Sequence, residues 1–326
     1  MLDKNQRVII LGKWAFKRIE MRDKEIYSNF IKDTQYPADL WSSNFDYLWA
    51  VSNPKRELVL WKVVSNMLVI FKLSRRNVLQ IAFPPLGKGS AEKAARVLLK
   101  CMKFCDKWNQ AIKGKTRVRV VTEQQLAFIK TSKLFERKFR YKKLSGVDRH
   151  ISVEKMISLS GKEFKDLRNN INRFRKSCPN AIVRPAEAKD YPALLGLKET
   201  WNQSLGVKYK RIWDDQFYLQ LMKFYQELDH IVLVAENEGQ IIGVVSGGIL
   251  PHGQAWGALL KKRPEYPGLS EFLNVEFARE IHKIDPSVEL INLGTDSGNK
   301  GGLRTFKDKF RPTLNARRYS LYLRPR

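Results

Sequence analysis

Hydrophobic and polar positions along the first half of the chain alternate as in strands and helices that pack together. Residues 57–64 and 67–73 are rich in β-branched and aromatic side chains, and the Ser65-Asn66 pair between them predicts a hairpin. Residues 91–110 predict an amphipathic helix, because their apolar side chains recur at helical spacing: Ala94, Leu98, Cys101, Cys105 and Trp108. The same criteria predict a helix at 20–32, strands at 78–82 and 118–121, and a helix at 124–133. The alternation indicates a mixed sheet with packed helices, and it makes Cys101 and Cys105 core residues.

Residues 160–176 form a distinct amphipathic block. Ser160 and Glu163 match the S-x-x-E capping box that opens many helices. An apolar stripe at helical spacing follows, and a polar, cationic stripe runs beside it: Lys165, Arg168, Asn172 and Arg175. The Cys178-Pro179 pair ends the pattern. The block therefore predicts a helix with a cationic ridge, which we expect to connect two domains.

The second half repeats the alternation of strands and helices. The predicted strands are 181–184, 231–236, 240–249, 254–260, 289–293 and 319–323, and the predicted helices are 191–201, 214–228, 269–282 and a short one after residue 302. This β-α-α-β-β-β-α-β-α-β order is that of the GCN5-related N-acetyltransferase (GNAT) fold, an analogy that does not establish function. The first half follows a similar plan. We therefore predict an α/β fold of mixed sheets with two tandem GNAT-like domains, 1–159 and 181–326, joined by the basic helix 160–180.

Charge separates the two halves of the chain. The protein has 60 Lys and Arg residues against 33 Asp and Glu, a net charge of +27. Residues 1–180 hold 39 of the basic and 16 of the acidic residues, so the remainder is nearly neutral. Such asymmetry indicates that one half contacts a polyanion, nucleic acid first and an anionic lipid surface second. A plain solvated basic surface is the alternative.

Several classes of protein are excluded by composition. No apolar run approaches the roughly 20 residues of a membrane-spanning helix, and no signal peptide is recognisable. Three cysteines do not make a disulfide scaffold, and the four scattered histidines show no zinc-ligand spacing. We therefore expect a cytoplasmic protein without a metal, and a tandem fold that builds its own cleft is compatible with a monomer.

The segment with the most chemical content is residues 294–312, GTDSGNKGGLRTFKDKFRP. A glycine-bearing loop leads into a short helix with an apolar stripe and a cationic stripe, the latter made of Lys300, Arg304, Lys307 and Arg311. Free N–H groups at a helix start, with glycines that allow close approach, favour a phosphate or a developing oxyanion. Spacing alone does not distinguish this from a short solvated helix.

Two blocks of the chain resemble a known family. GLRTFKDKFRP at 302–312, with RRYSLYL after it, resembles the C-terminal signature of the phosphatidylglycerol lysyltransferase C-terminal domain family, and LSGKEFKDLRNNINRFRK at 159–176 resembles its other characteristic block. The family is similar to the Fem-type transferases, which share tandem acyltransferase-fold domains and take an amino acid from aminoacyl-tRNA. Two features differ from the family pattern: no multi-span membrane region precedes the resemblance, and Leu314 stands where Trp is expected. The acceptor therefore stays open between a phosphatidylglycerol-like lipid and another small or peptidic molecule.

The resemblance implies an aminoacyltransferase that moves an amino acid from aminoacyl-tRNA to an amine or hydroxyl. It implies that Arg304 and Lys307 face the reacting ester or the terminal phosphates, and that Asp296 binds the donor's amino group or acts as base. The residues implied in substrate or tRNA binding are Arg168, Asn172 and Arg173, expected to line an inter-domain cleft, together with Lys300, Lys309 and Arg311. No cofactor is implied, because the donor ester is already activated.

Two other functions compete with this one. An acyl-CoA-dependent N-acetyltransferase would bind pyrophosphate through a [Q/R]-x-x-G-x-[G/A] loop, which Gln254, Gly257 and Leu259 only approach. The segment 261–268 that follows contains two prolines, which remove backbone donors. A non-catalytic nucleic-acid-binding protein would use the same basic half but has no need for the 294–312 segment. Peripheral contact with an anionic membrane is compatible with the net charge under each interpretation.

Overall fold

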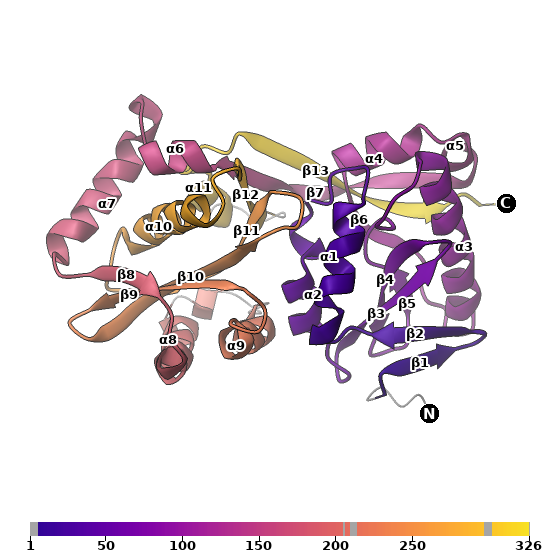
Figure 1. Ribbon diagram of the computed structural model, residues 1–326, viewed down its shortest axis with the longest axis horizontal. Coiled ribbons are helices and arrows are strands. Elements are labelled where there is room, and N and C mark those ends of the chain that lie inside the picture. Colours follow the sequence, from indigo (N-terminus) through magenta and orange to yellow (C-terminus); the bar gives the residue numbers. More distant parts are fainter. Residues whose placement is uncertain (1–5, 205, 209–213, 297–301, 326) are drawn as a thin grey trace. The chain divides into compact units, whose positions relative to one another are not determined.

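The computed structural model describes residues 6–204, 206–208, 214–296 and 302–325, and it consists of two compact units (Figure 1). Unit 1 comprises Met1–Asp148 and Ala316–Arg326, and unit 2 comprises Arg149–Asn315. The boundary expected at residues 159/160 thus falls inside unit 2, and the last strand returns to unit 1. The tandem arrangement expected from the order of elements is present, with one unit inserted in the sequence of the other.

Unit 1 is an α/β layer structure built on one twisted sheet. Its elements in chain order are β1 (Val8–Leu11), β2 (Trp14–Arg18), α1 (Lys24–Lys32), α2 (Phe45–Val51), β3 (Glu57–Val64), β4 (Met67–Ser74), β5 (Leu79–Ile81), α3 (Ala91–Gln110), β6 (Val118–Thr122), α4 (Glu123–Lys130), α5 (Lys133–Lys138) and most of β7 (Phe139–Ser152) and β13 (Leu314–Leu323). The strand order is β1-β2-β3-β4-β5-β6-β13-β7. Helices α3, α4 and α5 cover one face, and α1 and α2 cover part of the other.

The hydrophobic pattern accounts for the core of unit 1. Strands β3 and β4 form the predicted hairpin, and its turn residues Ser65 and Asn66 have φ values of 49° and 59°, as a type I′ turn requires. Helix α3 begins and ends where the spacing predicts, with Ser90 as its N-cap. Cys101 and Cys105 are fully buried, which confirms that they are core residues. Burial raises the pKa of both thiols, so they stay protonated.

Unit 2 repeats the plan with its own strands and helices. Its elements are the end of β7, α6 (Val153–Ser158), α7 (Lys165–Ser177), β8 (Ile182–Pro185), α8 (Tyr191–Ser204), α9 (Asp215–Phe224), β9 (Ile231–Asn237), β10 (Gln240–Ile249), β11 (Ala255–Lys262), α10 (Leu269–Ile284), β12 (Leu290–Thr295), α11 (Gly302–Asp308) and the start of β13. The strand order is β12-β11-β10-β9-β8. Helices α7 and α10 pack on one face of this sheet, and α8 and α9 lie on the other (Figure 1).

The prediction that Ser160 caps the basic helix is wrong. Ser160 does not cap it: a short 3-10 turn (Lys162–Phe164) precedes α7, and its N-cap is Gly161, with φ of 90°. Leu159 is also left-handed, with φ of 48°, so the chain turns twice before the helix begins. The Arg168 side chain donates to the carbonyl oxygens of Leu159 and Gly161, which stabilises this entry.

Candidate active site at the carboxyl ends of strands β11 and β12

The two parallel strands of unit 2 pair only where they begin. Their paired residues are Ala255 with Ile291 and Trp256 with Asn292, after which no further pairing between β11 and β12 is formed in the described residues. A bulge at Ala258 in β11, opposite Ser246 and Gly247 of β10, changes the direction of the strand just beyond this point. Ligands of α/β sheets bind outside the carboxyl ends of parallel strands. The residues that follow Trp256 and Asn292 are therefore the first place to look for chemistry.

A buried carboxylate stands at the start of the helix that connects these strands. Glu271 lies in the first turn of α10 and is 6% exposed. Its Oε1 accepts a hydrogen bond from Lys309 Nζ at 2.7 Å and a longer one from Asn170 Nδ2 at 3.4 Å. The start of a helix favours a negative charge, and the Lys309 ammonium adds to that preference. Glu271 is thus a buried acidic side chain held in a fixed position by Asn170 of α7 and by Lys309, the residue that follows α11.

Lys262, at the end of β11, lies near the same carboxylate. Its Nζ donates to the carbonyl oxygens of Arg263 at 3.0 Å and Pro264 at 3.3 Å. Burial lowers the pKa of Lys262, and the negative charge of Glu271 partly opposes that effect. An amine of lowered pKa beside a carboxylate is a common arrangement in sites of proton transfer.

The end of β12 is held by a buried guanidinium. Arg149, which is 8% exposed, donates from Nε at 3.0 Å and from Nη2 at 2.6 Å to Oδ2 of Asp296. Its Nη1 donates to Oδ1 of Asn315 at 2.6 Å, and Asp308 of α11 lies 3.5 Å from Nη2. One side chain therefore connects the residue after β12, helix α11 and the start of β13. A buried charge pair of this kind needs such additional hydrogen bonds to offset its desolvation.

Lys307 points at backbone atoms of the same strand end. Its side chain is buried, and its Nζ donates at 2.9 Å to the carbonyl oxygens of both Gly294 and Thr295. Carbonyl groups that leave a strand ladder require other donors when they are buried. Lys307 supplies these donors, so it fixes the last residues of β12 and anchors α11 against them.

The model of the family described as phosphatidylglycerol lysyltransferase, C-terminal, matches residues 49–322. The chain belongs to this family. No curated protein matches the chain.

Solved structures similar to this member of the lysyltransferase family share its fold. L-PGS from Bacillus licheniformis is 16% identical, with 93% of each chain covered and a TM-score of 0.65. FemX is 7% identical, with 95% of this chain and 97% of that one covered and a TM-score of 0.60. A tandem GNAT protein from the clavulanic acid biosynthesis pathway is 9% identical over 95% and 99%, with a TM-score of 0.50. These likenesses confirm the tandem GNAT-like fold and the Fem-like resemblance, and the family is one of GNAT-fold transferases.

The structure distributes the site residues implied by the family resemblance over several places in unit 2. Asp296, Lys307 and Lys309 lie at the strand ends described above. Arg304 is exposed on α11 and lies 3.7 Å from Asp308, and Arg311 Nε donates to the carbonyl oxygen of Glu163 at 2.9 Å. Lys300 lies outside the described residues. Their catalytic and binding roles stay predictions.

The three residues expected on the basic helix all belong to α7. Arg168 is half-buried and is engaged by the turn before the helix. Asn172 and Arg173 are exposed and line an open hollow of about 640 Å³, together with Asn169, Arg175 and Lys176. Of the cationic stripe predicted from the spacing, Asn172 and Arg175 line this hollow, and Lys165 and Arg168 do not.

Sequence reasoning missed four residues of this site: Asn170, Glu271, Lys262 and Arg149. Asn170 is part of the quoted block but falls between its two stripes, and Lys262 was noted only as part of the 261–268 segment. Glu271 is the one acidic residue in the first turn of a helix that follows a basic strand end, and this is a usable signal. Nothing in the local pattern marks Arg149, because its partner Asp296 is 147 residues away.

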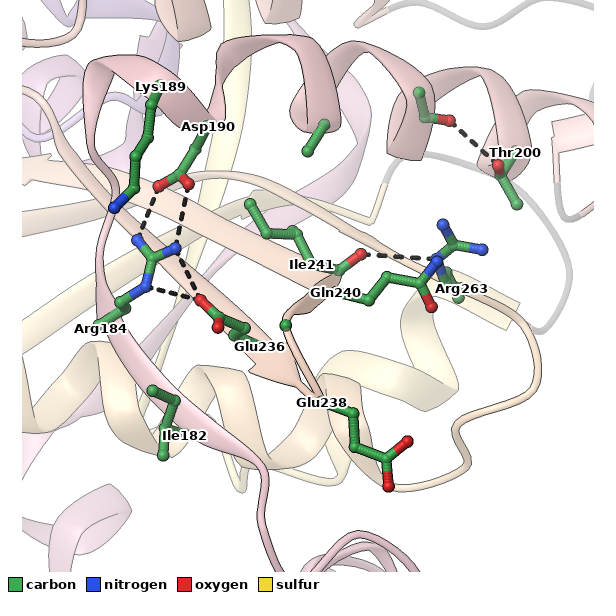
Figure 2. Close-up of a pocket in the computed structure, with 13 residues that line it drawn as sticks. Ile182, Arg184, Lys189, Asp190, Thr200, Glu236, Glu238, Gln240, Ile241 and Arg263 are labelled. Atoms are coloured by element: carbon green, nitrogen blue, oxygen red, sulfur yellow. Dashed lines mark hydrogen bonds and ion pairs between the residues drawn. The ribbon is translucent and has the colours of Figure 1, made fainter.

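A second hollow of unit 2, of about 890 Å³, contains none of the implied residues (Figure 2). Arg184 of β8 dominates it: the guanidinium binds Asp190 at 2.7 and 3.0 Å and Glu236 at 2.7 and 2.9 Å. Hydrogen bonds from Arg184 are the main cause of the lowered pKa of Asp190. Arg184 thus joins β8 to β9 and to the start of α8, and this ion network stabilises the edge of the sheet. Positive and negative side chains balance around the hollow, so it offers no preference for an anion.

In the described part of the chain no helix is both long enough and apolar enough to cross a bilayer.

Proposed function

We propose that this protein transfers an aminoacyl group from aminoacyl-tRNA to an amine or hydroxyl acceptor. The observation that carries the proposal is the buried carboxylate of Glu271, held by Lys309 and lying near Lys262 at the carboxyl ends of β11 and β12. Family membership supports the transferase class, and L-PGS and FemX share the fold. What we propose beyond the transferase class is the donor, aminoacyl-tRNA, and the acceptor, an amine or hydroxyl.

Aminoacyl transfer from an ester requires positioning of the attacking amine or hydroxyl, removal of its proton and stabilisation of the oxyanion. Glu271 accepts the proton of the attacking amine or hydroxyl while the new bond forms to the ester carbonyl carbon. Lys262 and Lys309 stabilise the oxyanion of the tetrahedral intermediate. The bond from that carbon to the ribose oxygen then breaks, and the proton returns from Glu271 to the ribose oxygen. No electrons are exchanged with a cofactor.

Arg149, Asp296 and Lys307 act in this proposal as positioning residues. Their contacts fix the end of β12 and helix α11, which leads directly to Lys309. Asn172 and Arg173, in the hollow on α7, bind phosphates of the donor RNA. Arg304, exposed on α11, contacts the terminal phosphates of the donor in this proposal.

The acyl-CoA alternative is less well supported by the start of α10. A pyrophosphate bound there needs free N–H groups and positive charge. Glu271 already places a carboxylate in the first turn. The helix start is also covered: Gly268 lies so close to α7 that a Cβ on it would stand 2.1 Å from the carbonyl oxygen of Asn170. A protein that only binds nucleic acid would have no use for charged side chains buried at strand ends.

The experiment supplies the purified protein with unfractionated tRNA charged with labelled amino acids, and with phosphatidylglycerol vesicles or a mixture of small amines as acceptors. Deacylation of the tRNA with label recovered in an acceptor supports the proposal and names both substrates. Glu271→Gln should abolish the transfer, and Glu280→Gln on the same helix serves as a matched control. Label that stays on tRNA under every acceptor, while acetyl-CoA is consumed, would favour the acyl-CoA alternative.

A further inference from the structure

One face of the unit 1 sheet carries cations that have no acidic partner among the residues that the structure describes. Lys115 and Arg117 lead into β6, and Arg140 and Lys142 lie two residues apart on β7, so their side chains share a face. Strand β13 lies between β6 and β7 and contributes Tyr322. None of these four cations forms an ion pair with a carboxylate of the described residues. We call these five residues the Tyr322 surface.

Tyr322 lies at the centre of this group. Lys115 Nζ is 5.2 Å and Arg140 Cζ is 5.6 Å from the centre of the ring, and Arg117 hydrogen-bonds the phenol. Although burial acts to raise the pKa of Tyr322, the hydrogen bond and charge of Arg117 and the charge of Lys115 lower it overall. Three cations thus converge on one half-buried aromatic ring, and Arg140, Lys142 and Lys115 are exposed to solvent.

Such an arrangement is costly in the free protein. Like charges at this spacing repel one another, and acidic residues that could offset them are available elsewhere: Arg149 and Arg184 in unit 2 both contact carboxylates. Unit 1 holds 35 Lys and Arg against 13 Asp and Glu, whereas unit 2 holds 25 against 20. An uncompensated cluster in the more basic unit is best explained by a bound polyanion.

We propose that the Tyr322 surface binds the phosphodiester backbone of an RNA, with a base or ribose stacked against Tyr322. Cations that track a backbone, interleaved with an aromatic ring, are the composition of single-strand and loop binding sites. The inference rests on the proposed function in one respect, because it gives the aminoacyl-tRNA donor a second place of contact, in unit 1. A lipid surface fits less well, since peripheral membrane sites insert aliphatic side chains. The exposed aliphatic residues on the strands of unit 1 are Val8 and Ile10 on β1 and Val63 on β3, and both strands are far from β7 in the strand order.

The test measures binding of fluorescently labelled, unfractionated, uncharged tRNA to the full chain over a series of salt concentrations. The double variant Arg140→Gln/Lys142→Gln should bind more weakly, and the slope of log K against log salt should fall by about 0.7 to 0.9 for each phosphate contact removed. The matched control is Lys103→Gln/Lys107→Gln, which removes two exposed lysines of α3 in the same unit and should leave the slope unchanged. Equal slopes and affinities for wild type and Arg140→Gln/Lys142→Gln would overturn the proposal.

Stacking is tested separately from charge. Tyr322→Ala should weaken tRNA binding by roughly 5- to 150-fold, the range measured for loss of one stacked base, whereas Tyr322→Phe should bind like the wild type. Unchanged binding by Tyr322→Ala, with circular dichroism showing a folded protein, would contradict the stacking contact. Binding to phosphatidylglycerol vesicles that depends on Arg140 and Lys142, without binding to tRNA, would replace RNA by a membrane and also overturn the proposal.

The two proposals fail in different ways. If the Tyr322 surface binds tRNA and no aminoacyl group is transferred, the proposed RNA-binding surface is supported and the proposed transferase activity is rejected. If transfer proceeds and the surface variants bind tRNA like the wild type, the proposed activity is supported and the proposed RNA-binding surface is rejected.

Discussion

The two units show the same plan with different contents at the same place. Each has a parallel strand pair joined by a long helix, β5–α3–β6 in unit 1 and β11–α10–β12 in unit 2, and each pair is formed by only one or two residues. In unit 1 the turn after β5 is buried and apolar, and its Leu86 exchanges backbone hydrogen bonds of 2.8 Å with Leu68 of β4. In unit 2 the corresponding turn begins with Lys262 and leads to Glu271. The end of β5 is covered by apolar side chains, whereas the end of β11 carries charged side chains.

The helix starts differ in the same sense. Ser90 caps α3 by accepting a hydrogen bond from the Lys93 amide, whereas α10 begins at Gly268 without a side-chain cap. The acidic residue in the first turn of α3, Glu92, is half-buried, with 40% of its side chain exposed, and accepts a hydrogen bond from Ser132 at 2.6 Å. Its counterpart Glu271 is buried. Function in such folds depends on the residues at the strand ends, and the charged residues of the candidate site described above all belong to unit 2.

The largest expected effect is a difference in transfer activity between variants of these two glutamates. Glu271→Gln should lower aminoacyl transfer by roughly 100- to 10,000-fold, because it removes a general base and keeps the shape of the side chain. Glu92→Gln should leave the rate unchanged. Single-turnover transfer rates measure both, and thermal unfolding shows whether each variant is folded. A comparable loss in both variants would mean that the two helix starts serve one role, which would break the comparison.

The next effect concerns stability. Arg149→Met removes the guanidinium that neutralises buried Asp296, and loss of one partner of a buried pair costs about 3 to 5 kcal/mol. Urea denaturation followed by hydrogen exchange in α10 and α11 measures the loss in unit 2. The control is Arg317→Met in unit 1, where the pair with Glu123 is exposed and its loss should change the free energy of unfolding by less than about 1 kcal/mol. Equal effects would show that Arg149 adds nothing beyond a surface ion pair.

The third prediction is a pH dependence of unit 1. Burial raises the pKa of Asp39 to about 6, and the charge of Asp148 acts in the same direction. The folded state then binds more protons than the unfolded state, so stability should fall as the pH rises from about 4 to about 6, by up to about 3 kcal/mol. Denaturation curves at both ends of this range test it. Asp39→Asn should remove that fall, and a fall that persists in the variant must come from other groups.

The smallest effect is expected at Lys261, on the opposite face of β11 from Lys262. Its buried ammonium pairs with Asp214 at 2.8 Å and lies 3.4 Å from the centre of the Trp201 ring, and burial lowers its pKa. Lys261→Met should change stability by less than about 1 kcal/mol at neutral pH, because the partner left behind, Asp214, keeps 28% of its side chain in contact with solvent, whereas Asp296, the partner of Arg149, keeps only 6%. Asp214→Ala, which keeps the ammonium and removes its partner, should destabilise more.

Lys261 also gives unit 2 a pH response opposite to that of Asp39. The folded pKa of the amine is depressed, so the unfolded state binds more protons and stability should rise with pH below the ordinary lysine value of 10.5. This rise should be smaller in Lys261→Met than in the wild type. Identical alkaline profiles would show that Lys261 is as protonated in the folded protein as in water.

Periodicity predicted most elements of both units because their apolar positions repeat. Strand β10 and helix α3 have the predicted bounds, and the Glu238-Gly239 turn between β9 and β10 has the positive φ angles that its sequence favours. Strand β7 was missed, because residues 140–143 are an exposed basic run without alternation. Strands β1 and β2 were missed as well, since each is only four or five residues long.

The candidate site was predicted only in part, for a different reason. Asp296, Lys307 and Lys309 came from a block resemblance, which marks positions without telling what they touch. Their contacts join distant parts of the chain: Lys309 binds Glu271, 38 residues away, and Arg149 binds Asp296. A single charged residue in an apolar helix or strand carries no period, so Glu271 and Arg149 become visible only when the fold brings their partners to them.

The return of β13 to unit 1 has a consequence for how the chain is made. This strand lies between β6 and β7 in the sheet, yet it is translated after the 167 residues of unit 2. At common ribosomal speeds of about 5 to 20 residues per second, β6 and β7 wait roughly 8 to 33 seconds for the strand that separates them. The unit begun first is completed last. A nascent chain released just before residue 314 would carry all of the proposed catalytic residues in unit 2. Its unit 1, however, would lack the strand that pairs between β6 and β7.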